Sequence, residues 1–330
     1  MNSAYLIIAF YIFIIGICIG SFLNVVILRG LAQESFVFSR SKCPKCGNQL
    51  TWYMNIPLFS YLFLRGKCAF CKEKISPQYP IVEFITGVAF LGSFIAFGFS
   101  LKTLFICAFL SLFIVLAVCD ILETVIIEQH TYILYGLGIL YSILNLGDVN
   151  WIWSILGGIF SFLFLELLAR FGLIVAGYRT FGDGDSFIVL GFGSIFGFLN
   201  TLIIIALAVL IQGLSYIFPL LIQTFKNKDY KLFASYCGVI FLVGYITLVN
   251  YFKVFELGLI ELIVLLILGI FIVFNILKSI RNKVPEDFDE AKTKFNIIPF
   301  GPALIIAATV CLFWLPQIKN IVTTIFPFWG

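Results

Sequence analysis

The sequence predicts an all-α fold, a polytopic bundle of about eight to ten transmembrane helices with one small loop domain between the first two. Three observations predict it. Of the 330 residues, 62% are hydrophobic and only 12% are charged, whereas a soluble domain carries about 25% charged residues. Apolar runs of about 20 residues, long enough to cross a bilayer, recur along the chain. The longest early loop contains four cysteines.

The apolar runs, taken in chain order, give ten expected spans. The first run is too long for a signal-peptide core and lacks a basic flank before it, so we expect a retained span. The run 186–225 is too long for one crossing, and a break near Gly197 to Asn200 divides it into a short span and a full one. The spans lie near 4–28, 80–99, 101–119, 129–147, 151–176, 186–198, the rest of that run to 225, 232–252, 257–278 and 299–325.

Loop charge orients these spans, because Lys and Arg accumulate in cytoplasmic loops. With the N-terminus outside, all but three of the 21 basic residues lie in inner loops or at the adjoining span ends. The exceptions are Lys102, Lys253 and Lys319. The inner loops are then 29–80, 120–128, 177–185, 226–231 and 279–298.

The first inner loop has a metal-binding pattern. It contains C-P-K-C and, 21 residues later, C-A-F-C, which place Cys43, Cys46, Cys68 and Cys71 in two knuckles. Four thiolates so arranged can bind structural zinc tetrahedrally. The alternatives are two disulfides or four free thiols, and a reducing cytosol disfavours disulfides. We therefore expect a small cytoplasmic zinc-binding domain.

Two aspartates are the candidate catalytic residues. Asp120 lies in VLAVCDILE and Asp185 in FGDGDSFIV, and the expected topology places both on the cytoplasmic side. A carboxylate beside hydrocarbon is costly and indicates a functional site. Two carboxyls that share one proton can activate water and protonate a carbonyl oxygen. Gly182 and Gly184 would let the backbone approach a substrate. The alternative is two ordinary helix-end carboxylates.

Four stretches together resemble the type IV prepilin peptidases, bacterial membrane aspartyl proteases of the GxGD type. They are GSFLNVVILR at 20–29; the four cysteines with NIPLFSYLFLRGKC and ISPQYPIVEFITG, up to residue 87; Asp120 with Ile126 and the GDGD of 182–185; and PFGPAL at 299–304. The family pattern has eight spans, so the extra pair near 232–278 would be an inserted hairpin. The family usually has Pro at the position of Ile127 and Lys at that of Phe187.

The resemblance implies an aspartic endopeptidase of the bacterial inner membrane that removes the leader of type IV prepilins or pseudopilins at the cytoplasmic face. Asp120 and Asp185 would be its catalytic dyad. It also implies N-methylation of the new N-terminus with S-adenosylmethionine, associated with the zinc-bearing domain; a peptidase without methylation is the alternative. The expected partners are prepilins and phospholipid, without nucleic acid. Residues that could line a substrate or methyl-donor region are Asn24, Arg29, Asn55, Arg65 and Glu83.

The expected division of the chain is a first transmembrane helix (1–28), the zinc domain (29–80), a membrane core with both aspartates (81–231), the hairpin (232–280), and a loop with the last helix (281–330). Two other classes of function are weaker. A zinc-bearing transporter would show an internal repeat, and none is detectable. A non-catalytic assembly scaffold would leave both aspartate motifs without a purpose.

Overall fold

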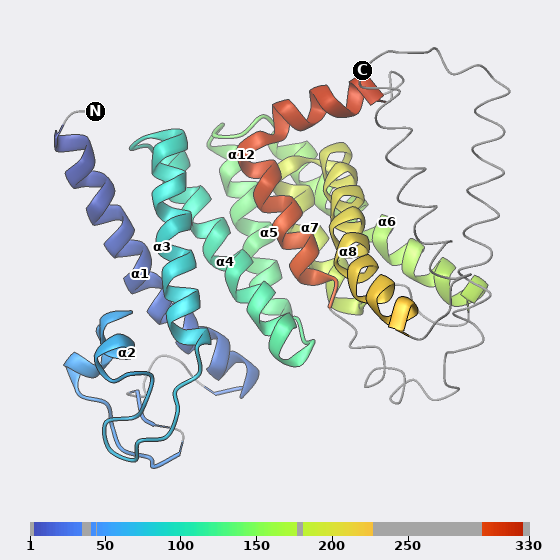
Figure 1. The fold of residues 1–330 in the computed structure, drawn as a ribbon. Coiled ribbons are helices and arrows are strands. Elements are labelled where there is room, and N and C mark those ends of the chain that lie inside the picture. The colour runs from blue at the N-terminus through green and yellow to red at the C-terminus, as the bar shows by residue number, and fades with distance from the viewer. Residues whose placement is uncertain (1–2, 35–40, 44, 177–180, 227–298, 326–330) are drawn as a thin grey trace, which may run out of the picture. The chain divides into compact units, whose positions relative to one another are not determined.

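The computed structural model describes residues 3–34, 41–43, 45–176, 181–226 and 299–325 (Figure 1). Within these residues every regular element is a helix, apart from two isolated β-bridges. The elements are α1 (Ser3–Leu31), η1 (Trp52–Asn55), α2 (Phe59–Phe63), α3 (Gln78–Phe97), α4 (Leu101–Glu123), α5 (Glu128–Ile143), α6 (Trp151–Ala176), α7 (Asp183–Phe196), α8 (Phe198–Lys226) and α12 (Gly301–Ile325).

Six of the described helices are long and apolar enough to cross a membrane. Their candidate spans are Tyr5–Leu31, Gln78–Phe97, Leu101–Glu123, Trp151–Gly172, Phe198–Ser215 and Gly301–Asn320. The prediction of an all-α, multi-pass membrane protein is therefore confirmed. Helices α5 and α7 have 16 and 14 residues and are shorter than these spans. The expected spans 232–252 and 257–278 lie outside the described residues.

The predicted break in the long apolar run is present. Helix α7 ends at Phe196, Gly197 has a φ of +78°, and α8 starts at Phe198. Glycine adopts this left-handed backbone without steric cost. The chain can therefore end one helix and begin the next within a single residue.

The chain forms two compact units. The first comprises Met1–Ala208 with Pro299–Thr309, and the second comprises Val209–Ile298 with Val310–Gly330. The candidate site lies in the first unit. In the described part of the second unit, α12 is kinked: Trp314 has non-helical backbone angles two residues before Pro316, whose ring cannot continue a regular helix.

Helix α1 packs closely along α3 because small residues face the contact. A Cβ on Gly16 would lie 2.8 Å from the Cα of Gly87, and one on Gly20 would lie 2.7 Å from the Cα of Glu83. In a membrane, such close approach is what joins helices, since lipid gives no hydrophobic drive between them. The GSFLN motif thus begins with a residue that must be small.

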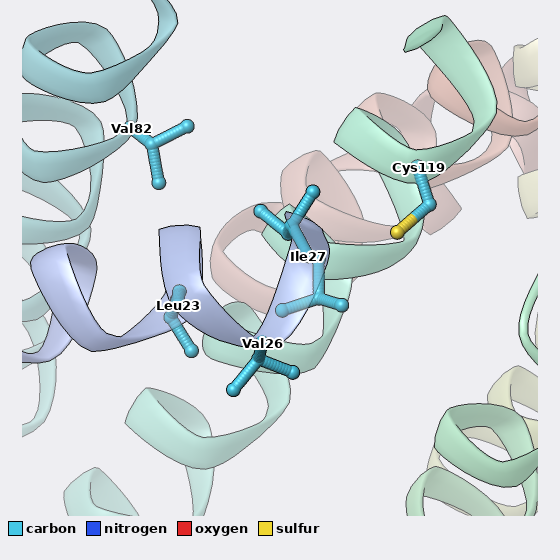
Figure 2. Close-up of a cluster of buried hydrophobic side chains, with 6 residues drawn as sticks. Leu23, Val26, Ile27, Val82 and Cys119 are labelled. Atoms are coloured by element: carbon cyan, nitrogen blue, oxygen red, sulfur yellow. The ribbon is translucent and has the colours of Figure 1, made fainter. Parts of the chain in front are cut away.

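A buried apolar cluster joins the end of α1 to α3 and α4 (Figure 2). Ile27 is fully buried at its centre, and Cys119, which precedes Asp120, lies at its edge on α4. The cluster therefore fixes the end of the helix that carries the first aspartate. Its members are Leu23, Val26, Ile27, Val82, Val115 and Cys119.

Candidate functional site

Asp120 occupies the last turn of α4 and is only 5% exposed. The helix ends at Glu123 and is capped by Thr124, which has a left-handed backbone and whose N–H donates to the Asp120 carbonyl at 2.9 Å. The side-chain oxygen Oδ2 of Asp120 is buried and has no hydrogen-bond partner within the described part of the chain. It lies against Gly301, where an added Cβ would overlap it.

Asp185 occupies the first turn of α7 and is also 5% exposed. Its Oδ2 accepts a hydrogen bond from the Gly182 N–H at 2.9 Å, and its own N–H donates to the Gly182 carbonyl at 3.2 Å. This reciprocal pair starts the helix and fixes the rotamer of the aspartate. The turn thus orients the carboxylate before any substrate is bound.

Gly184 is required for packing between two parts of the site. A Cβ there would lie 2.6 Å from two carbon atoms of the Ile126 side chain, in the connection between α4 and α5. The structure therefore gives a different reason for this glycine from the close substrate approach expected from the sequence. Ile126 holds the GDGD turn against the connection that follows Asp120.

The two aspartates, 65 residues apart in sequence, interact electrostatically. Asp185 precedes the apolar part of α7 and lies outside the six candidate spans. Burial raises the pKa of Asp185 to about 7; the Gly182 N–H acts in the opposite direction, and the charge of Asp120 raises the pKa further. Two carboxyls in this relation favour one shared proton over two charges. The arrangement can therefore supply an acid and a base together.

The two positions that depart from the family pattern are both packed. The Phe187 ring lies 5.8 Å from that of Tyr132 on α5 and 5.1 Å from that of Phe162 on α6, measured between centroids. Ile127 caps α5 with a φ of −79°, a value that proline also adopts. Replacing proline with isoleucine therefore leaves this backbone angle unchanged, and Phe187 fills an aromatic contact between helices.

The four cysteines of the first loop come together. Their Sγ atoms all lie within 4.8 Å of one another, and those of Cys43 and Cys71 are 3.9 Å apart. None of the four forms a disulfide. Sulfur atoms bound tetrahedrally at about 2.3 Å from an ion are separated by about 3.8 Å. The cluster therefore has the composition and size to hold a metal ion.

Each cysteine pair lies on its own hairpin, and the two hairpins have the same backbone structure. The N–H of Cys43 donates to the Asn48 carbonyl at 2.9 Å, and the N–H of Cys68 donates to the Glu73 carbonyl at 2.8 Å, five residues on in each case. The tight turn needs positive φ at Gly47 (+73°) and at the equivalent Lys72 (+58°). Each pair is thus placed by its own local hydrogen bonds.

Backbone donors also favour the charged form of one ligand. The N–H groups of Cys71 and then Phe70 lower the pKa of the Cys68 thiol to about 7. A metal ion binds the thiolate, not the thiol. The Cys71 thiol behaves in the opposite way: the backbone of Glu73 acts to lower its pKa, but burial and the neighbouring thiols raise it to about 11, so charge is favoured first on Cys68.

Three of the five residues expected near a substrate or methyl-donor region lie in or near the junction of α1 and α3 with the cysteine domain. Asn24 is buried and its Nδ2 donates to the Tyr79 carbonyl at 3.1 Å. Glu83 is buried and its Oε2 accepts from the Leu58 N–H at 2.7 Å. Asn55 ends η1, three residues before Leu58.

The other two of those five lie elsewhere in the local structure. Arg29 is in the last turn of α1, and Arg65 follows α2 with a φ of +50°. Gly301 is the residue that sequence reasoning missed. Its motif, PFGPAL, was visible, but its contact with Asp120 depends on the fold.

Comparisons with known proteins all point to one family. Residues 14–97 match the bacterial peptidase A24 N-terminal domain. The chain is 35% identical over 188 residues to a prepilin leader peptidase/N-methyltransferase of Myxococcus xanthus, covering 56% of this chain and 55% of the relative. A protein of the same name from Bacillus subtilis is 35% identical over 182 residues, covering 55% and 71%, and one from Klebsiella pneumoniae is 32% identical over 195 residues, covering 57% and 84%. No solved structure matches.

Proposed function

Because the chain belongs to the prepilin leader peptidase/N-methyltransferase family, we propose that it is a membrane aspartic endopeptidase that removes the leader peptide of type IV prepilins or pseudopilins. One observation carries this proposal: Asp120 and Asp185 are both buried and interact, although 65 residues separate them in sequence. A pair of unrelated helix-end carboxylates would face water or headgroups instead.

The pair would act as one acid and one base. Asp185, whose pKa is raised to about 7, holds the shared proton, and Asp120 accepts a proton from the attacking water. The water oxygen bonds to the scissile carbonyl carbon while Asp185 protonates the carbonyl oxygen. When the tetrahedral diol collapses, the carbon–nitrogen bond breaks, the proton gained by Asp120 passes to the leaving amine, and one hydroxyl of the diol returns its proton to Asp185, which restores the starting pair. The Gly182 N–H keeps Asp185 in place throughout.

The reaction would take place at the cytoplasmic face of a bacterial inner membrane. The distribution of basic residues supports this orientation, since only Lys102, Lys253 and Lys319 lie outside the inner loops and their adjoining span ends. Both aspartates then lie at the cytoplasmic ends of their helices. The N-terminus would be on the outer side.

The four cysteines would hold a zinc ion with a structural role. Sulfur ligands in this arrangement are typical of closed zinc sites without an open coordination position. Each hairpin has its own local backbone hydrogen bonds. The ion would join the two hairpins to each other. It takes no part in the peptide cleavage.

The names of the relatives also include N-methyltransferase. S-adenosylmethionine would supply a methyl group to the amine exposed by cleavage. Asn24 Oδ1 and Gln78 Nε2, at the junction of α1 and α3 with the zinc domain, are buried and have no hydrogen-bond partner within the described residues. These two atoms could accept from and donate to the polar groups of the methyl donor, which supports placing its site here.

The decisive test compares Asp120→Asn and Asp185→Asn in the full chain, reconstituted in lipid with a purified prepilin. Each substitution should lower the cleavage rate about a thousandfold, because general acid–base catalysis contributes roughly 10²–10⁴-fold. Mass spectrometry of the product measures it. The neighbouring carboxylates supply matched controls: Glu123→Gln and Asp183→Asn should keep most of the activity. Normal cleavage by either asparagine variant would show that the two aspartates are not a catalytic dyad.

The same assay can examine methylation. With a methyl donor labelled in the methyl group, the first residue of the cleaved pilin should acquire the label. Cleavage without labelling would leave a peptidase only. Because the two readouts are separate, loss of methylation cannot be mistaken for loss of the dyad.

A further inference from the structure

The zinc-bearing domain exposes an unusual number of large apolar side chains. Between its two hairpins, Trp52 is 79% exposed, Leu62 70% and Phe63 83%. A domain surrounded by water rarely displays such a cluster, and one rimmed by polar residues marks an interaction surface. The exposed apolar residues are Trp52, Tyr53, Ile56, Phe59, Leu62 and Phe63.

Half of these side chains form one face of a helix. Phe59, Leu62 and Phe63 on α2 follow the i, i+3, i+4 spacing that aligns residues on one side. Ser60 and Tyr61, on the other side, are partly buried. Helix α2 is therefore amphipathic, with its apolar face turned away from the domain.

The depth of α2 follows from a single hydrogen bond. Leu58, the residue before α2, donates its N–H to Glu83 Oε2 at 2.7 Å. Glu83 lies five residues after the start of the candidate span Gln78–Phe97, a rise of about 7.5 Å along the helix. The start of α2 is thus level with the second turn of a membrane helix. In Figure 1, α2 belongs to the loop domain that connects α1 to α3.

The charge around the apolar face fits an anionic surface. Between residues 41 and 77 the only acidic residue is Glu73, against six basic ones. Arg65 and Lys67 directly follow α2, and Lys67 is bridged to Lys74 across the second hairpin. Aromatic and aliphatic side chains beside Lys and Arg are typical of segments that lie in the headgroup region of anionic bilayers. Trp and Tyr, as at 52 and 53, favour the same depth.

We propose that the segment Trp52–Lys67 is a membrane-interface anchor, in which the apolar face of α2 inserts among the acyl chains and Arg65, Lys67 and Lys74 bind anionic headgroups. Glu83 holds this anchor at the correct depth through Leu58. The anchor holds α2 and the second hairpin of the zinc-bearing domain against the membrane, with the first hairpin farther from it. This inference does not depend on the peptidase activity.

Photo-crosslinking of the full chain in nanodiscs tests it. Benzoyl-phenylalanine replaces Phe63 in one variant and Gln49, an exposed polar residue of the first hairpin, in the control. After irradiation, mass spectrometry should find about tenfold more lipid adduct at position 63 than at position 49. Equal adducts at both positions, or none at 63, would overturn the anchor. Adducts to a second copy of the chain, or to an added prepilin, would show that the apolar face binds that protein and would also overturn the anchor.

The charge of the lipid allows a second, independent test of the anchor. Each basic residue near an anionic surface changes the affinity about fivefold, so adduct yield at 63 should be higher in phosphatidylglycerol than in phosphatidylcholine. The combined change Arg65→Gln, Lys67→Gln and Lys74→Gln should remove that difference. Lys42→Gln with Lys45→Gln, on the first hairpin, should leave it in place. An unchanged lipid preference in the triple variant would contradict the headgroup contact.

Discussion

Because Gly301 has no side chain, α12 can lie directly against Asp120. The first turn of α12 passes so close to Asp120 that an added Cβ would overlap the unpaired Oδ2 and come within 3.4 Å of Ile188. Asp120 is buried by this contact, and burial is what distinguishes it from an ordinary carboxylate at a helix end. Gly301 therefore helps to form the site through its backbone alone, by this close approach and by a backbone hydrogen bond to the Asp120 carboxyl.

Gly301→Ala should lower the cleavage rate by about a hundredfold, because a displacement of Asp120, the proposed catalytic carboxylate, by about 1 Å can cost that much. Cleavage of a prepilin by the purified variant measures it. Gly92→Ala is a matched control, since nothing lies within 4 Å of a Cβ at that position in α3. The control should keep its activity and gain up to about 1 kcal/mol of helix stability. Equal activity of the two variants would show that Asp120 tolerates the methyl group.

The residues of the site were predictable to different degrees. The sequence predicts Asp120 and Asp185 as a pair because charge is rare in the apolar segments and both stand at segment ends; both are buried in the structure, and their catalytic role stays a prediction. The role of Gly301 could not be predicted, because it arises only when α12 is laid against the end of α4. The packing of Phe187 between two aromatic rings could not be predicted either, since it depends on the rotation of α7.

At the scale of elements, the two hairpins of the cysteine domain are near-repeats. The same backbone bonds recur in both: Leu50 donates to the Ser41 carbonyl at 2.9 Å, and Ile75 donates to the Gly66 carbonyl at 2.8 Å. The spacing of the cysteines was enough to predict four clustered thiols. The hydrogen bonds that place each pair are local, which is why the sequence pattern was sufficient.

The purified full chain should contain about one zinc ion per molecule, and Cys43→Ser with Cys46→Ser should remove it, since two thiolates bind zinc far more weakly than four. Elemental analysis by mass spectrometry measures the metal content. Cys107→Ser with Cys311→Ser, two buried cysteines outside the cluster, should keep the ion. A metal-free wild type whose cysteine domain resists proteolysis would contradict the zinc assignment.

Helix lengths are where element prediction was less accurate. The expected spans 129–147 and 186–198 correspond to α5 and α7, of which α5 ends four residues early. The apolar pattern continues past Ile143, but the chain turns at Asn145, where φ is +53°. Hydropathy alone does not register such a turn. The break at Gly197 could be predicted because the run was too long for one span.

At the scale of the whole molecule, the order of the helices brings the site together. The chain leaves Asp120 at the end of α4 and passes through α5 and α6 before α7 begins at the second aspartate. Loop charge predicts that both aspartates face the cytoplasm, and this orientation stays a prediction. The expected hairpin at 232–280 lies outside the described residues, and its place in the molecule stays a prediction.

The expected orientation predicts which loops lie on each side of the membrane. Asp148→Cys, in the exposed loop between α5 and α6, should react with a membrane-impermeant maleimide in intact cells, because this loop is expected outside. Val125→Cys, in the exposed connection between α4 and α5, should react only after permeabilisation. Labelling is measured by a shift in mass, relative to the parent protein. The opposite pattern would invert the topology and place the aspartates outside the cytoplasm.

The short length of α7 has a further consequence. Its 14 residues rise only about 21 Å, whereas hydrocarbon is about 30 Å thick, and ten of these residues are buried within the protein. About 9 Å of that thickness is therefore left to be filled at its two ends. Asp185 stands at one of them, so its hydration is governed by how deeply solvent penetrates the bundle. The packing of the protein interior would then limit how much water, a reactant in peptide hydrolysis, reaches Asp185.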